Sequence, residues 1–198
     1  MNLETFIKQY WNYYLDLERQ LLDTKYYVEF GKQNNKTFSI EYLKLLQICC
    51  SEIDVVAKTI AYFFDSNFDY KKSNIQKWGF AIHNIFCDIE LKTVLFNQDY
   101  SLTPWKKWEY EQFKDINQKL RYRLKKGKET PKWWTAYNSV KHARTSRYIG
   151  EETNFSRANL ENVVLSLSAL YILEKWFIQY LLEQENNNIS IEESSLFI

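Results

Sequence analysis

The sequence predicts an all-α fold, an up-and-down bundle of about five to six helices, on three observations. Glycine and proline together number 6 of 198 residues, about 3% against an average near 12%, which is too few for a turn-rich β-sandwich. Apolar residues recur at alternating steps of three and four along several long stretches, the period of a helix that buries one face. Helix-capping residues precede several of these stretches.

Two long helices are expected over residues 3–30 and 39–65. The apolar positions of the first are Leu3, Ile7, Tyr10, Tyr14, Leu17 and Leu21. Those of the second are Leu43, Leu46, Cys50, Ile53, Ala57, Ile60 and Phe64. Gly31 is a natural stop for the first helix. Long helices joined by a short loop form an antiparallel hairpin.

Two further helices are expected before residue 127. Ser73-Asn74-Ile75-Gln76 has the form of a capping box and predicts a third helix to about Ile89. Residues 91–105 lose the helical period and contain Pro104, so they predict a long irregular connection or one short hairpin. Helical propensity returns over 105–126, where one side holds Trp108, Phe113, Ile116 and Leu120.

Two helices are expected in the last third of the chain. Thr130-Pro131 predicts a helix start, with Thr as N-cap and Pro at the first position, and this helix runs to about Thr145. Thr153 or Asn154 then caps a long helix that ends near Glu185. We expect residues 1–185 to form a single helical domain. We expect 186–198 to be a polar tail, frayed or docked on a neighbour.

Charge is balanced overall, at a formal net +1, but not along the chain. Residues 104–148 carry 13 basic and 4 acidic side chains, whereas 1–103 and 149–198 are net negative. A positive segment in a neutral protein favours a surface for a polyanion such as RNA. Equally, these cations could neutralise the acidic C-terminal helix. The candidate RNA-binding residues are Lys119, Arg121, Arg123, Lys125, Lys126, Lys141 and Arg147.

Several classes of function have no support in the sequence. Cys49, Cys50 and Cys87 have no C-x-x-C spacing, which is typical of buried thiols in a reduced compartment. No signal stretch and no uncharged run of about 20 residues is present, so we expect a cytoplasmic protein without a membrane partner. We expect no cofactor and no metal, since glycine-rich phosphate loops are absent and the only histidines are His83 and His142.

The predicted helix over 131–145 has a polar side opposite its apolar one. The apolar stripe is Trp133, Ala136, Tyr137, Val140 and Ala143, and the polar face is Thr135, Asn138, Ser139, His142 and Thr145. Asn138 and His142 are four residues apart and therefore share that face. An asparagine can orient an imidazole, which can act as acid or base near neutral pH. The alternative is a solvated face, or an Asn–His pair that closes a hydrogen bond within the bundle.

The hexapeptide Tyr137-Asn138-Ser139-Val140-Lys141-His142 resembles the signature of the HEPN superfamily. That signature is an arginine, a polar residue that is often asparagine, a few further positions and a histidine. His142 matches the histidine and Asn138 the polar position, while Tyr137 stands where the family has arginine and supplies no permanent cation. The resemblance implies an all-α homodimer. It also implies a metal-independent endoribonuclease of a prokaryotic defence or toxin–antitoxin system.

Two functions follow. In the first, the chain is a HEPN-like RNA-associated protein in which a ribose 2′-OH attacks the adjacent phosphate. His142 is then the acid or base, Asn138 orients it, and Arg144 or Lys141 holds the phosphate. In the second, the chain is a catalytically inactive helical module that dimerises or binds a protein partner, such as a cognate toxin or antitoxin. The missing motif arginine favours the second function, and the basic segment favours the first.

Overall fold

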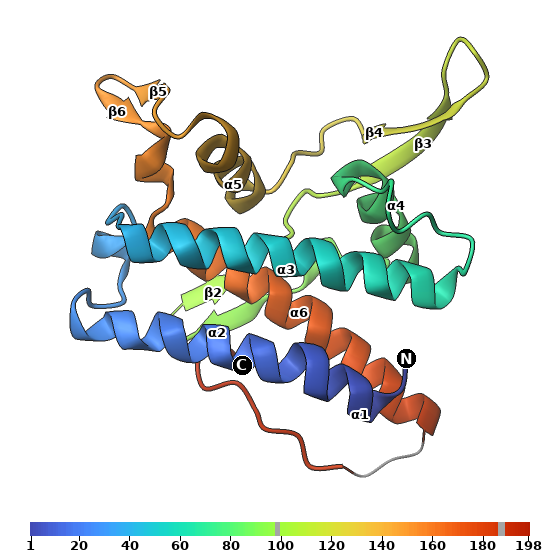
Figure 1. The fold of residues 1–198 in the computed structure, drawn as a ribbon, viewed down its shortest axis with the longest axis horizontal. Helices are drawn as coiled ribbons and strands as arrows, with labels where there is room; N and C mark the ends of the chain where they lie inside the picture. The colour runs from blue at the N-terminus through green and yellow to red at the C-terminus, as the bar shows by residue number, and fades with distance from the viewer. Residues whose placement is uncertain (98–99, 186–188) are drawn as a thin grey trace.

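The computed structural model of the chain describes residues 1–97, 100–185 and 189–198, and it mixes helices with three two-stranded antiparallel sheets (Figure 1). The all-α expectation is therefore wrong. The helices are α1 (Leu3–Phe6), α2 (Asn12–Asp23), α3 (Ile40–Phe64), α4 (Ile75–Ile85), α5 (Lys132–Ala143) and α6 (Leu160–Glu185). A π-helical turn, η1 (Ile7–Trp11), joins α1 to α2. Short 3₁₀ turns are η2 (Thr24–Tyr26), η3 (Lys32–Asn34), η4 (Ile89–Leu91) and η5 (Asn154–Arg157).

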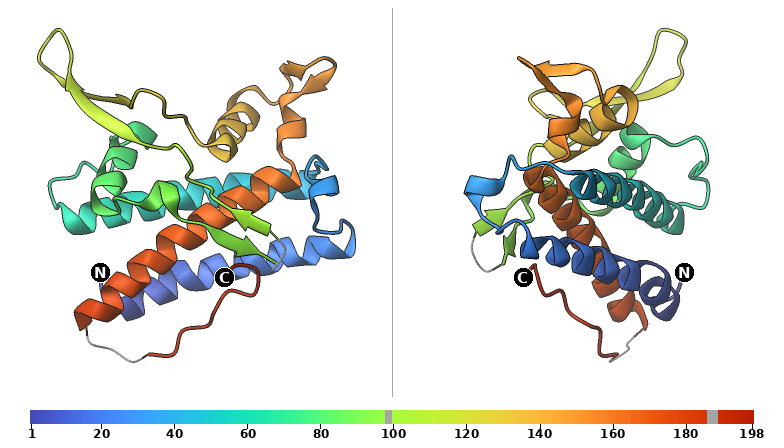
Figure 2. Two further views of the ribbon diagram at one scale, coloured as in Figure 1. Left: turned by 180° about the vertical axis from the view of Figure 1, so that it is seen from behind. Right: turned by 60° about the vertical axis from the view of Figure 1, so that its left-hand side comes forward.

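The strands form three hairpins. They are β1 (Val94–Phe96) with β2 (Tyr100–Leu102), β3 (Tyr110–Lys114) with β4 (Leu120–Leu124), and β5 (Arg147–Ile149) with β6 (Glu152–Thr153). The first confirms the short hairpin that was one of two alternatives for residues 91–105, of which 98–99 lie outside the described residues. The second and third project from the same side of the helical layer, with α5 between them (Figures 1 and 2).

Helix α6 lies at the centre of the fold. Its buried side chains point in nearly every direction around the axis, from Leu160 through Leu170 and Tyr171 to Leu181. A helix that is apolar all round must be covered on all sides. Helices α1 and α2, α3, and α5 supply three of those covers. Figure 2 shows α6 running diagonally between them.

The long helix expected over 39–65 is confirmed as α3, and local capping explains its start. Ser39 Oγ accepts a hydrogen bond from the N–H of Tyr42 at 3.0 Å. In the same way Asn74 Oδ1, rather than the Ser73 side chain, caps α4 by accepting from the N–H of Lys77 at 3.2 Å. Both caps are Ser or Asn side chains that accept the N–H group three residues later, a pattern that can be recognised in the sequence.

The first and last helices are shorter than expected. The first ends at Asp23, because residues 24–26 tighten into η2, and Gly31 adopts an extended φ of −169° rather than closing a helix. The last begins at Leu160, because Asn159 Oδ1 accepts from the N–H of Asn162 at 3.1 Å and acts as the cap. The amide of Asn154 is used elsewhere, donating to the carbonyl of Ala143 at 2.8 Å.

The helix expected over 105–126 is wrong, because this stretch forms the β3–β4 hairpin. The Asp115 carboxylate accepts the N–H groups of Asn117 at 2.8 Å and Lys119 at 3.0 Å, which bends the chain into a turn. The inner face of the hairpin packs on α4. There a Cβ on Gly79 would lie 2.6 Å from the Trp108 ring and 2.7 Å from that of Tyr110, so only glycine permits this close approach.

The described part of the tail, residues 189–198, docks on the same chain; residues 186–188 lie outside the described residues. Leu196 and Phe197 are each only 2% exposed. The N–H of Leu95 donates to the carbonyl of Ile198 at 2.9 Å, and that of Asn97 donates to the carbonyl of Leu196 at 2.8 Å. The tail thus extends the β1 edge. Among the described residues, no helix has the length and apolar character needed to cross a membrane.

One acidic residue lies among the buried apolar side chains of α6. Its burial leads to a prediction for stability. Glu174 is fully buried, and neither carboxylate oxygen has a hydrogen-bond partner among the described residues. Burial, and secondly the charge of Glu52, raises the pKa of Glu174 well above its ordinary value. The folded state therefore binds the proton more tightly than the unfolded state, and the carboxyl destabilises the fold increasingly as pH rises above about 4.3.

We expect Glu174→Met to raise the free energy of unfolding at pH 7 by about 1–3 kcal/mol, because it removes an unpartnered buried polar group. The gain should be larger at pH 8 than at pH 4, measured by urea unfolding. Glu183→Met, on the exposed side of the same helix, is the matched control and should change little. A gain for Glu174→Met that does not vary with pH would contradict this account.

Candidate nucleic-acid interface

Helix α5 turns its apolar stripe inward and its polar face outward. Trp133, Ala136, Tyr137 and Val140 are buried where α5 packs on α3 and α6. The indole N–H of Trp133 donates to the carbonyl of Pro104 at 2.9 Å, which fixes the start of the helix against the preceding loop. The opposite, polar face therefore points away from the core, on the side where the β3–β4 and β5–β6 hairpins project (Figure 1).

The structure places Asn138 and His142 on that face but does not join them. His142 is exposed and Asn138 is half-buried, and neither side chain hydrogen-bonds to any described residue. Arg144 caps the C-terminal end of α5 two positions after His142. Two residues turn a helix by about 200°, so Arg144 does not share the face of His142.

Tyr137, at the position where the HEPN signature has arginine, lies inside the fold. It is 8% exposed. The ammonium of Lys141 donates to its hydroxyl at 3.0 Å and lies 5.1 Å from the centre of its ring. Lys141 is therefore directed toward Tyr137 along the side of the helix.

A cation that the sequence analysis missed reaches the polar face from another element. Arg157, at the end of η5, donates from Nη1 to Ser139 Oγ at 2.6 Å, and its guanidinium lies 4.7 Å from the ring centre of Tyr148. Ser139 precedes His142 by three residues and so lies on the same side of α5. In the part of the chain that the structure describes, Arg157 forms no ion pair with a carboxylate.

Backbone contacts hold η5 against α5 and so position Arg157. The N–H of Phe155 donates to the carbonyl of Arg144 at 3.1 Å, and that of Asn154 donates to the carbonyl of Ser146 at 2.9 Å. Because these partners close the β5–β6 hairpin, Arg157 reaches Ser139 across 18 residues of sequence. No local motif marks this contact, and Arg157 lies outside the basic segment.

Two adjoining hollows, of about 320 and 540 Å³, flank this contact and share Lys132 and Arg157 in their walls. Their charged lining residues are the cations Lys36, Lys106, Lys107, Lys132 and Arg157 and the acids Glu129 and Glu152. The walls therefore carry an excess of positive charge. Glu161, on α6, pairs with both Lys36 at 3.2 Å and Lys132 at 2.6 Å, which holds the two ammonium groups in place.

Most of the predicted RNA-binding cations carry an acidic partner. On the outer face of the β3–β4 hairpin, Arg121 pairs with Asp115 at 3.0 Å, Arg123 with Glu111 at 2.7 Å and Lys125 with Glu109 at 2.5 Å. Arg147 lies 3.9 Å from Glu151 on the β5–β6 hairpin. Lys119 and Lys126 form no ion pair with a described carboxylate.

The cations of the basic segment are thus neutralised mainly by acids of the same segment. Of the pairs with α6 that the alternative reading expected, the structure shows the one between Lys132 and Glu161. Six cations remain without a partner among the described carboxylates, namely Lys106, Lys114, Lys119, Lys126, Lys141 and Arg144. The surface around α5 therefore keeps a positive charge, although a smaller one than the sequence count suggests.

A cluster at the base of the β3–β4 hairpin ties it to the helices. The Glu109 carboxylate accepts from Lys125 and lies 2.9 Å from the ammonium of Lys128, which in turn contacts Glu90 at 2.6 Å. His83 of α4 is half-buried and lies 3.4 Å from Glu109 through Nε2. Lys125 first, then Lys128 and His83, hold the pKa of Glu109 at about 2.

We expect Glu109→Gln to loosen this hairpin base. A carboxyl whose pKa is lowered by folding stabilises the fold above its unfolded value near 4.3, and this contribution disappears as pH falls toward 2. Glu109→Gln should therefore lower the free energy of unfolding by about 1–2 kcal/mol at pH 7 and leave it unchanged near pH 2. Glu111→Gln, which breaks a more exposed pair with Arg123, should have a smaller effect. An equal loss at both pH values would refute this role.

Comparisons with known proteins add no further constraint on this surface. Within the described residues, no group of three or more His, Cys, Asp or Glu side chains is arranged to hold a metal ion. No protein-family model, curated protein or solved structure matches the chain.

Proposed function

We propose that the chain is a HEPN-like, RNA-associated protein of the cytoplasm that binds RNA across the polar face of α5 and the two projecting hairpins. The observation that carries the proposal is the position of Arg157. Its guanidinium, free of any described carboxylate, sits on Ser139 beside the face that holds Asn138 and His142. Guanidinium is the cation best suited to phosphate, since it can donate two parallel hydrogen bonds.

This arrangement supports the chemistry of RNA cleavage that the resemblance implies. His142 takes the proton of a ribose 2′-OH, whose oxygen attacks the adjacent phosphorus. The bond from phosphorus to the 5′-oxygen breaks, and that oxygen receives a proton from a second acid, which the resemblance assigns to the partner protomer of a homodimer. Arg157, rather than Tyr137, neutralises the charge on the phosphate. Asn138 orients the imidazole once substrate is bound, since catalytic hydrogen bonds often tighten only in the complex.

A second candidate function is an inactive module that binds a protein partner, such as a cognate toxin or antitoxin, or a second copy. Two observations favour it. Tyr137, at the motif's arginine position, is buried, and its hydroxyl accepts a hydrogen bond from Lys141. In addition, the imidazole of His142 has no orienting partner among the described residues. A polar helix face without catalytic contacts can equally serve as a contact surface.

Binding should be electrostatic and located on the hairpin side. We expect Lys119→Gln with Lys126→Gln to weaken binding to single-stranded RNA of any sequence and to reduce the salt slope by about 1 per lost phosphate contact. The charge-matched control is Lys8→Gln with Lys25→Gln, in η1 and η2 on the opposite side, which should change binding little. Fluorescence anisotropy against salt concentration measures both. Absence of binding at low salt would overturn the RNA proposal and leave the protein-binding module.

Cleavage, where present, should depend on His142 and Arg157. We expect His142→Ala to lower the cleavage rate about 10²- to 10⁴-fold while leaving RNA affinity almost unchanged, because the lysines and arginines of the surface stay in place. Arg157→Gln should lower both. His83→Gln, at the other histidine, is the control and should retain activity. RNA binding without cleavage in the unmodified protein would support a catalytically silent RNA-associated protein, and Tyr137→Arg then tests whether the family's cation restores cleavage.

A further inference from the structure

The docked segment 189–198 occupies a specific seat on the side of the molecule opposite the two projecting hairpins (Figures 1 and 2). The seat is formed by η1 and α2, by α6, and by the edge of β1. Its contacts lie outside the proposed RNA surface, so its function is independent of that proposal.

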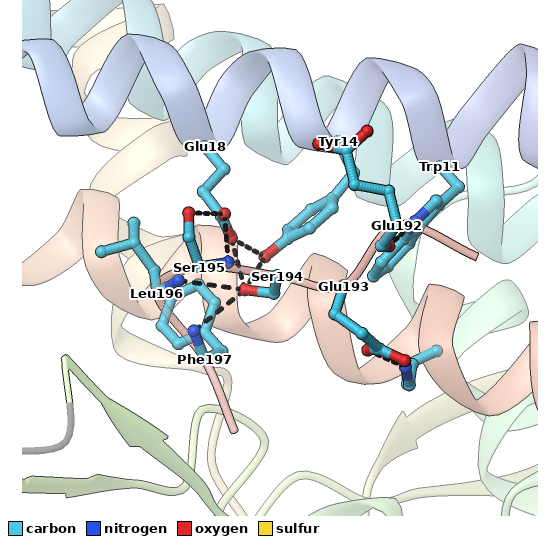
Figure 3. Close-up of polar contacts among 10 residues, drawn as sticks. Trp11, Tyr14, Glu18, Glu192, Glu193, Ser194, Ser195, Leu196 and Phe197 are labelled. Carbon is cyan, nitrogen blue, oxygen red and sulfur yellow. Dashed lines mark hydrogen bonds and ion pairs between the residues drawn. The ribbon is translucent and has the colours of Figure 1, made fainter. Parts of the chain in front are cut away.

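Glu18 of α2 is the polar centre of this seat. It is 2% exposed, and its carboxylate is surrounded by donors, as Figure 3 shows. One oxygen accepts from the N–H of Ser195 at 2.7 Å and its hydroxyl at 2.6 Å. The other accepts from the hydroxyls of Tyr14 and Ser194. A buried carboxylate is tolerated only when its lone pairs are satisfied in this way, and here the segment supplies three of the four donors.

The seat also forms hydrogen bonds with the main chain of the segment and packs against one of its aromatic side chains. Leu95 exchanges two backbone hydrogen bonds with Ile198, at 2.9 and 3.2 Å. The indole of Trp11 donates to the carbonyl of Glu192 at 2.8 Å. The buried ring of Phe197 lies 5.7 Å from that of Phe96 and 5.6 Å from that of Tyr171, measured between ring centres.

These are the contacts by which proteins recognise extended peptides. The edge of β1 pairs with the backbone, Glu18 selects two adjacent hydroxyl residues, and the rings of Phe96 and Tyr171 select an aromatic residue two positions later. We propose that the seat is a peptide-binding site for the sequence Ser-Ser-Leu-Phe-Ile and that it accepts this segment from a second copy of the chain as well as from its own. A second copy carries the same sequence and therefore offers identical donors and the same ring.

The attached segment has the advantage of a high effective concentration, so exchange between copies should become visible at high protein concentration or after the attachment is cut. To test this, a protease site is introduced at 186–188, circular dichroism checks that the variant folds, and the folded protein is then cleaved. A fluorescent peptide spanning 189–198, amidated at its end, is added in excess, and its uptake is followed by anisotropy. We expect stoichiometric uptake with displacement of the cleaved segment.

Peptide variants test which contacts carry recognition. The peptide with Ser194→Ala and Ser195→Ala should bind at least about tenfold more weakly, because it loses two hydrogen bonds to a charged acceptor. The matched control is Glu192→Gln in the peptide, whose exposed side chain is replaced while its carbonyl still meets Trp11. In the protein, Glu18→Gln should weaken binding, and Glu183→Gln should not.

The exchange between copies is tested on the uncut protein. We expect light scattering at increasing concentration to show a dimer that excess free peptide 189–198 dissociates and that the peptide with Ser194→Ala and Ser195→Ala leaves intact. A cleaved, still folded protein that takes up no labelled peptide overturns the peptide site. Uptake by the cleaved protein together with a strictly monomeric uncut chain overturns exchange with a second copy.

Discussion

The need to cover helix α6 on every side determines the rest of the structure. Because its apolar residues point around the whole axis, α1 and α2, α3, and α5 must each contribute a face. The ring of Tyr171 is covered from yet another direction by Phe197 of the docked segment. This requirement places α5 with its apolar stripe inward, and so its polar face, with His142, is presented to solvent between two hairpins. The same central helix thus separates two surfaces, one that faces the hairpins and one that holds the segment 189–198.

The elements that the sequence predicts correctly are those whose signals are local. The three-and-four spacing gives α3 almost to the residue. The start expected for α5 is off by one residue, because Pro131 occupies the N-cap position and the helix begins at Lys132. The helix predicted over 105–126 was wrong because the apolar spacing of this stretch fits a helix as well as alternating strands. What decides for strands is a turn closed by the Asp115 carboxylate and a row of ion pairs between facing strands. Such cross-strand partners become visible only once the register of the hairpin is known.

The same distinction holds for the candidate sites. That Asn138 and His142 share one helix face follows from their spacing alone, and the structure places both there. The approach of Arg157 to Ser139 depends on the β5–β6 hairpin folding back on α5, which no local pattern shows. Likewise, Glu18 meets Ser195 across 177 residues of sequence, so that the helical spacing around Glu18 gives no sign of its partner. Contacts of this kind arise from packing around α6, and no local pattern singles out either Arg157 or Glu18.

Hydrogen–deuterium exchange of the full chain, with and without single-stranded RNA, tests the claim that RNA meets the face of α5 that Arg157 borders. We expect slower exchange in residues 144–157 and in strands β3 and β4 when RNA is bound, since ligand contact and reduced opening both protect backbone amides. We expect unchanged exchange at Leu95, Asn97 and Ser195 in the seat of the docked segment. Protection confined to that seat, with none around α5 and the hairpins, would contradict the claim.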